Sequence, residues 1–267
     1  MQFFGDLNPV IQALIATLFT YFVTALGASL VFFFKGVKRQ ILDAMLGFAA
    51  GVMIAASFWS LIVPSIELCK DLGYSIWLMP ALGFVSGGLF IVAASILMDK
   101  YSFTTISKDS NKLSTIKRSI LLVVAVTVHN IPEGFAVGIA FGGSKLGLEG
   151  LSLLSAISLA IGIGLQNFPE GAAVSLPLYR EGFSKKKSFM YGQLSGVVEP
   201  IAGVIGAISV FSIRAFLPFM FTFAAGAMIG IVAAELIPES AHKSKNLATV
   251  GVILGFTIMM ILDVALS

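Results

Sequence analysis

The chain has 267 residues, of which 57% are hydrophobic and only 12% are charged. A soluble domain carries about 25% charged residues, so this composition excludes an ordinary soluble protein and indicates an integral membrane protein. The net charge of +3 does not indicate nucleic-acid binding in such a chain, and the single Cys69 excludes an intramolecular disulfide and a cysteine-rich metal site.

Eight stretches are long and apolar enough to cross a bilayer as helices, since about 20 helical residues span roughly 30 Å of hydrocarbon. In chain order they cover residues 9–34, 41–64, 74–98, 119–141, 150–179, 188–211, 215–238 and 247–266, and none contains Lys or Arg. We therefore expect an all-α polytopic protein with one membrane domain over residues 1–267. The longest connection, at about 99–118, is predicted to be a mobile cytoplasmic loop.

Basic residues predict the orientation of the spans. Fourteen of the 17 Lys and Arg residues fall in the loops after spans one, three, five and seven, while Lys70, Lys145 and Arg214 fall one to each even-numbered loop. The positive-inside rule then places the odd-numbered loops in the cytoplasm and both termini outside it. We expect the first span to stay in the membrane, because Asp6 and no basic residue precedes it.

Two sequence patterns recur along the chain. Residues 48–54 match residues 223–229 at six of seven positions, and HNIPEG at 129–134 is echoed by QNFPEG at 166–171. The members of each pair would cross the membrane in opposite directions. They therefore indicate an inverted repeat of three spans, a central pair and three more, as in alternating-access transporters. Chance similarity of Ala- and Gly-rich helices is the alternative for the first pair.

Polar residues at i, i+1 and i+4 share one helix face in both central spans, and a further acid lies in the sixth. These residues are His129, Asn130, Glu133, Gln166, Asn167, Glu170 and Glu199. Each motif contains a proline, which frees a main-chain carbonyl one turn earlier as a further ligand. The glycine after each glutamate, Gly134 or Gly171, is expected to bring the two polar faces together.

Three of these carboxylates lie deep in spans that lack a basic residue. A charge at the bilayer centre costs roughly 2.5 to 3.5 kcal/mol, so Glu133, Glu170 and Glu199 need protons, water or bound cations. A mixture of imidazole, carboxylate and amide ligands suits Zn²⁺, Fe²⁺, Mn²⁺ or Cd²⁺ better than Mg²⁺ or Ca²⁺. The alternative is that the polar residues only join helices by hydrogen bonds.

The two central motifs resemble the signature of the ZIP family (Zrt- and Irt-like metal transporters), and the resemblance covers the whole chain. Gln166, together with PLYREG at 177–182, is similar to the GufA-type branch. The resemblance implies a ZIP-like bundle of eight helices, arranged as three, two and three, with a binuclear metal centre between the fourth and fifth.

The resemblance also implies a role for each residue of the motifs. One ion would be bound by His129, Glu133, Gln166 and Glu170, and its neighbour by Asn130, Glu133, Asn167, Glu170 and Glu199. Asn167 departs from relatives with Asp, and Ala234 from relatives with His. The residues expected along the pathway are Ser60 and Glu67 outside and Glu235, Glu239 and His242 toward the cytoplasm, although solvated polar residues at helix ends explain them equally well.

We therefore expect a transporter, not an enzyme, that moves divalent metal ions toward the cytoplasm: Zn²⁺ above all, with an Fe²⁺-, Mn²⁺- or Cd²⁺-preferring permease as the alternative. The rivals are an intramembrane metallohydrolase and a metal-gated or structural membrane protein. The chain lacks HExxH, and His129 is the one His within a span. The expected partners are the metal ion and the lipid of the plasma membrane, or of the inner membrane in a bacterium. A homodimer is left open.

Overall fold

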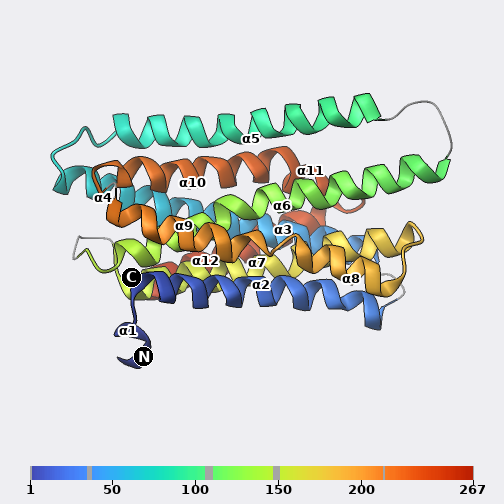
Figure 1. The fold of residues 1–267 in the computed structure, drawn as a ribbon, viewed down its shortest axis with the longest axis horizontal. Coiled ribbons are helices and arrows are strands. Elements are labelled where there is room, and N and C mark those ends of the chain that lie inside the picture. The colour runs from blue at the N-terminus through green and yellow to red at the C-terminus, as the bar shows by residue number, and fades with distance from the viewer. Residues whose placement is uncertain (1, 35–37, 106–110, 147–150, 213, 267) are drawn as a thin grey trace.

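The structure is a computed structural model that describes residues 2–34, 38–105, 111–146, 151–212 and 214–266, and every regular element among them is helical. The first half comprises α1 (Gln2–Gly5), α2 (Pro9–Phe33), α3 (Arg39–Ala56), η1 (Ser57–Ile62), α4 (Val63–Asp71), α5 (Leu78–Thr105) and α6 (Asn111–Gly143). The second comprises α7 (Leu153–Arg180), α8 (Lys185–Leu194), α9 (Val198–Ser212), η2 (Arg214–Phe216), α10 (Leu217–Ile231), η3 (Val232–Leu236), α11 (Ile237–Ser240) and α12 (Lys245–Leu266). The long helices run side by side in one bundle, and both termini lie at the end where α4 lies, opposite α8 (Figure 1).

Seven segments of the described chain are long and apolar enough to cross a membrane. They are Pro9–Phe33, Arg39–Asp71, Leu78–Met98, Val123–Gly143, Lys185–Ser212, Arg214–Ser240 and Lys245–Leu266. The all-α polytopic architecture is thereby confirmed, with seven spans by hydropathy instead of the eight predicted. The remaining predicted span is α7, whose 28 residues include Gln166, Asn167 and Glu170 and are correspondingly more polar.

The segment predicted as a loop at about 99–118 is largely helical. Helix α5 continues to Thr105 and α6 begins at Asn111, so both helices extend beyond the predicted spans. Polar residues such as Lys and Ser are compatible with a helix once it has left the hydrocarbon. Residues 106–110 of the predicted loop lie outside the described residues.

The sixth span is broken in its middle. Helix α8 ends at Leu194 and α9 begins at Val198, with a turn between them in which the Glu199 amide donates to the Gly196 carbonyl at 3.0 Å. The break puts Glu199 in the first turn of α9, where the positive end of the helix dipole favours a carboxylate.

A π-helical turn interrupts both the second and the seventh span. In η1 the Val63 amide bonds the Phe58 carbonyl, and in η3 the Ile237 amide bonds the Val232 carbonyl. Each turn comes directly before a proline at the second position of the next helix. The first residues of the two turns, Ser57 and Val232, are as far apart in the sequence as Phe48 and Phe223. This equal spacing supports the predicted repeat.

Glycines form the closest helix contacts. At four pairs a Cβ added to a glycine would lie only 1.9 to 2.1 Å from a main-chain oxygen of the other helix. The pairs are α3 with α12 at Gly51, α5 with α10 at Gly87, α7 with α2 at Gly171, and α6 with α9 at Gly138. Every pair joins helices from different parts of the predicted three, two and three arrangement. The repeats are therefore interleaved in space.

Candidate metal centre

The seven predicted ligands all lie inside the bundle. Helix α6 supplies His129, Asn130 and Glu133, α7 supplies Gln166, Asn167 and Glu170, and α9 supplies Glu199. None is more than 7% exposed, and the two that retain most exposure are Glu170 at 7% and His129 at 6%. A buried charge is costly without a partner, so this clustering demands a compensating group.

The motif glycines Gly134 and Gly171 do not contact the helices that we expected them to contact. A Cβ on Gly134 would lie 2.4 Å from the Glu199 carbonyl of α9, and one on Gly171 would lie 2.1 Å from the Thr24 carbonyl of α2. The expectation that these glycines join the two central polar faces to each other was therefore wrong. Their lack of side chains instead lets α9 and α2 approach from outside, and this delivers Glu199 and Thr24 to the site.

Glu199 is held by three neutral donors. Thr20 donates to its Oε2 at 2.5 Å, Thr24 donates to its Oε1 at 3.3 Å, and Asn167 Nδ2 donates to its Oε2 at 2.8 Å. Asn167 Nδ2 also faces the Thr20 carbonyl at 3.3 Å. With two acceptors on that side, the orientation of the Asn167 amide is determined and its oxygen is directed away from Glu199.

Asn130 is anchored in the same way as Asn167. Its Nδ2 donates to the Ser195 carbonyl at 2.8 Å, in the turn before α9, and its oxygen is left over. In each asparagine of the paired motifs, the side-chain nitrogen thus donates a hydrogen bond within the protein, and the side-chain oxygen is available to another ligand.

Several buried oxygens of the predicted ligands have no hydrogen-bond partner among the described residues. They are Asn130 Oδ1, Glu133 Oε1 and Oε2, Gln166 Oε1 and Asn167 Oδ1. Gln166 lies close enough to Glu133 for their side chains to interact, although neither Gln166 Nε2 nor Gln166 Oε1 has a partner at ordinary hydrogen-bond length and angle among the described residues. Most buried polar atoms in proteins are paired, so a set of unpaired oxygens from adjacent residues indicates a missing ligand that is a cation or a donor.

The acidic residues of the site interact electrostatically. Glu133 interacts with Glu170 and Glu199, and Glu170 also interacts with Glu235. Within the part of the chain that the structure describes, no three His, Cys, Asp or Glu side chains lie close enough together to hold a metal ion. An ion at this place would therefore need the amide oxygens as well as the carboxylates.

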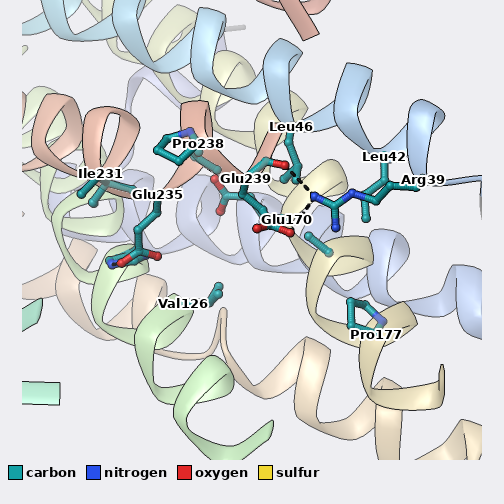
Figure 2. A pocket seen from close by; sticks show the side chains of 14 residues that line it. Arg39, Leu42, Leu46, Val126, Glu170, Pro177, Ile231, Glu235, Pro238 and Glu239 are labelled. Carbon is teal, nitrogen blue, oxygen red and sulfur yellow. Dashed lines mark hydrogen bonds and ion pairs between the residues drawn. The ribbon is translucent and has the colours of Figure 1, made fainter. Parts of the chain in front are cut away.

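A pocket of about 490 Å³ leads from the buried site toward the beginning of α3 and α11. The residues that line it include His129, Glu170, Glu235, Arg39 and Glu239, and Figure 2 labels the three glutamates among the lining side chains. His129 Nε2 lies 3.0 Å from Glu235 Oε1, so the predicted ligand on α6 touches the predicted pathway residue on η3.

The other pathway candidates have different surroundings. Ser60 is buried and donates to Asp263 Oδ1 at 2.7 Å, whereas Glu67 is half-buried in α4 and lies apart from the pocket. His242 is exposed and does not line the pocket. The structure thus brings Glu235 and Glu239 to the pocket that His129 and Glu170 line, and leaves Ser60, Glu67 and His242 away from it.

Sequence reasoning missed two buried acids and one arginine. Asp263 in α12 accepts from Ser60 and from Ser158, the latter at 3.0 Å, and Asp43 in α3 pairs with Arg39. Both acids lie near the ends of their predicted spans, where charge is common and gives little signal. The Ser60 position in η1 is related by the repeat to Glu235 in η3, which was a usable signal for a functional residue.

Together, the helical bundle and the buried acidic site with its open pocket define an integral membrane protein with the features of an ion transporter. The family model described as ZIP Zinc transporter matches residues 104–263. The chain is 39% identical to Zinc transporter ZIP11 of Xenopus tropicalis, over 97% of this chain and 98% of that protein.

Two bacterial relatives give the same result. Identity is 33% to Zinc transporter GufA of Myxococcus xanthus, over 95% of this chain and 98% of the relative. It is 34% to Zinc transporter ZIPB of Bordetella bronchiseptica, over 91% and 78%. The chain belongs to the ZIP zinc transporter family, so the predicted resemblance to this family and to its GufA-type members is confirmed.

Proposed function

We propose that the chain carries Zn²⁺ across the plasma membrane, or the inner membrane of a bacterium, toward the cytoplasm through a site between α6 and α7. In this proposal α7 is an eighth span and both termini face outward. Membership of the zinc transporter family supports the substrate. The excess of basic residues in the odd-numbered loops supports the orientation.

The observation that carries the proposal is the set of buried oxygens without hydrogen-bond partners on Asn130, Glu133, Gln166 and Asn167. Oxygen ligands of this kind bind a divalent cation, and the nearby His129 adds an imidazole nitrogen, which Zn²⁺ prefers. One ion would use His129, Glu133, Gln166 and Glu170. A second would use Asn130, Glu133, Asn167, Glu170 and Glu199, with Glu133 and Glu170 shared by both.

The proposed route continues through the pocket lined by Glu170, Glu235 and Glu239. Exposure increases along this route: Glu170 is buried, with 7% of the whole residue exposed, whereas the side chains of Glu235 and Glu239 are 35% and 56% exposed. An ion that moves outward along them regains water while it remains next to negative charge. Amide and shared carboxylate ligands bind more weakly than thiolates, which allows release.

The glycine contacts bear on how the site is exposed to each side. Because these contacts join helices of different repeats, one repeat cannot swing as a block without breaking them. They instead tie α2, α6, α7 and α9, which surround the proposed site, to one another in pairs. We propose that this group moves against α3, α5, α10 and α12 during transport.

The test is zinc uptake into proteoliposomes that contain a trapped zinc-sensitive dye. Glu133→Ala and Glu170→Ala should each abolish uptake, because each removes a shared carboxylate, while both proteins still reach the membrane and purify as folded species. Asp71→Ala, which removes an exposed acid at the end of α4, is the matched control and should leave uptake unchanged. Normal uptake in either glutamate variant rejects the proposed site.

The same vesicles test the proposal that the protein is not an enzyme. A metallohydrolase would cleave a transmembrane peptide included in the vesicles, and a structural or receptor protein would do neither. Zinc uptake without cleavage of the peptide supports transport. Competition by Fe²⁺, Mn²⁺ and Cd²⁺ at equal concentration then ranks the alternative substrates.

A further inference from the structure

Arg39 at the start of α3 lines the same pocket as the acidic residues of the proposed route. Its Nη2 lies 2.7 Å from Glu239 Oε1 and 2.6 Å from the Glu239 carbonyl. Figure 2 shows the Arg39 guanidinium directed toward Glu239, with dashed lines marking these two contacts. Among the described residues that line this pocket, Arg39 is the one with a positively charged side chain of the Lys or Arg type. A fixed positive charge therefore lies where a cation would leave.

Asp43 keeps this arginine in place. Its Oδ1 accepts from Arg39 Nε at 2.8 Å, and its Oδ2 accepts from the main-chain amides of Lys243 and Ser244 at 3.0 and 2.8 Å. Asp43 is fully buried, so both of its oxygens are used within the protein. The guanidinium thus lies between two carboxylates. The buried Asp43 carboxylate is fixed by its other hydrogen bonds, whereas the half-exposed Glu239 carboxylate is free to move away from Arg39.

We propose that Arg39 is an internal competitor of the transported cation, because its guanidinium occupies the Glu239 carboxylate and so prevents Glu239 from retaining the departing ion. The inference rests on the proposed function and concerns its last step. With Arg39 in place, Glu239 guides a cation only weakly and releases it. Without Arg39, the Glu239 carboxylate becomes a free ligand, and the ion stays longer in the pocket.

The size of the effect follows from the exposure of the pair. The Arg39 and Glu239 side chains are 22% and 56% exposed, and ion pairs in such positions contribute at most about 1 kcal/mol. At equilibrium this corresponds to a change of up to about fivefold in affinity. A structural role alone would have the opposite sign, since a damaged site binds zinc more weakly.

The experiment measures Zn²⁺ binding to the purified full chain by competition with a zinc-sensitive dye, and zinc release by stopped flow after addition of a chelator. Arg39→Gln should bind Zn²⁺ about three to five times more tightly than the wild type and release it more slowly by a similar factor. Arg39→Lys keeps the positive charge and should behave like the wild type. Arg39→Met, which retains the apolar part of the side chain, provides a second neutral variant should Arg39→Gln fail to fold.

Glu239→Gln completes the test. Alone it should weaken zinc binding by much less than the change of about three- to fivefold expected for Arg39→Gln, since Arg39 already occupies this carboxylate, but combined with Arg39→Gln it should cancel the tighter binding. This non-additivity is specific to competition for one carboxylate. Lys38→Gln, the loss of an exposed charge at the neighbouring position, is the matched control and should change nothing.

Three results would overturn the inference: unchanged or weaker zinc binding in both neutral Arg39 variants, tighter binding that Arg39→Lys shares, or tighter binding that persists in the double variant. None of these affects the proposed function, provided Glu133→Ala still abolishes uptake. Conversely, uptake that survives Glu133→Ala rejects the proposed function whatever the Arg39 variants do.

Discussion

Asn167 donates a hydrogen bond from Nδ2 to Glu199 Oε2 over 2.8 Å. An aspartate at this position would place two carboxylates side by side, which a second metal ion could bridge. In this chain Glu199 already accepts hydrogen bonds from three donors, one of which is the Asn167 amide. The Glu199 carboxylate therefore depends less on a bound cation for its stability. If the site holds the two ions proposed above, the ion beside Asn167 and Glu199 should therefore bind more weakly than the other.

Asn167→Asp tests this relationship. Without metal, the new carboxylate faces Glu199 in a buried site, so the free energy of unfolding of the apo-protein should fall by about 1 to 3 kcal/mol. The melting temperature should fall with it. Excess Zn²⁺ should restore the loss and raise the number of bound ions measured by equilibrium dialysis. The double variant Asn167→Asp with Glu199→Gln exchanges amide and carboxylate and should recover apo stability. An apo-protein as stable as the wild type contradicts the assigned hydrogen bond.

Zinc should stabilise the wild-type protein in detergent. The unpaired oxygens of Glu133 and its neighbours gain a ligand only in the folded state, so stability should rise by about 2.7 kcal/mol at a Zn²⁺ concentration 100 times the dissociation constant. Scanning fluorimetry with and without a chelator measures the shift. Glu133→Gln should lose most of it, and Mg²⁺ should give little shift with either protein. An equal shift in Glu133→Gln would mean that zinc binds elsewhere.

Gly87 and Gly88 differ in what surrounds them, although they are adjacent in α5. A Cβ on Gly87 would lie 1.9 Å from the Phe223 carbonyl of α10, whereas one on Gly88 would lie 3.7 Å from its nearest neighbour, the Gly226 carbonyl. Gly87→Ala should thus push α5 from α10 and lower the melting temperature strongly. Gly88→Ala should be neutral or slightly stabilising, because alanine favours helix by about 1 kcal/mol. Equal melting temperatures would refute the predicted contact.

Asp263→Asn removes a buried charge at the end of the bundle opposite the pocket. The remaining side-chain oxygen still accepts from Ser60 and Ser158, so we expect folding to be preserved. Because this acid lies beside the Ser60 position expected near the outer entrance, the KM for zinc uptake should rise several-fold with little change in maximal rate. Asp6→Asn, which removes an exposed charge, serves as the control. A fall in maximal rate alone would place Asp263 outside the entrance.

Much of the fold followed from short-range patterns. Uninterrupted apolar stretches located the helices of seven spans, and the spacing of His129, Asn130 and Glu133 correctly put them on one buried part of α6. These features depend on composition and helix periodicity, which a single sequence contains. The ligand roles of these residues remain predictions.

Other features depend on contacts between distant segments and could not be predicted. Thr20 and Thr24 in α2 reach Glu199 only because Gly171 and Gly134 let α2 and α9 approach α7 and α6. Arg39 meets Glu239 across 200 residues of sequence. Each π-helical turn changes the hydrogen-bond register over a few residues, and the break before Glu199 lies between α8 and α9. Such local changes do not alter the hydrophobic periodicity enough to be predicted from it.

The polarity of α7 has a consequence for how the chain is assembled in the cell. A segment that contains Gln166, Asn167 and Glu170 gains little from partitioning alone into lipid, since each such group is costly at the bilayer centre. Its favourable environment is the protein itself: α2 at Gly171 and the acceptors and donors around Asn167. Biogenesis should therefore be ordered, with the earlier helices retained near the insertion machinery until α7 is synthesised. Gly171→Leu, which blocks the close approach of α2, should leave α7 incompletely inserted.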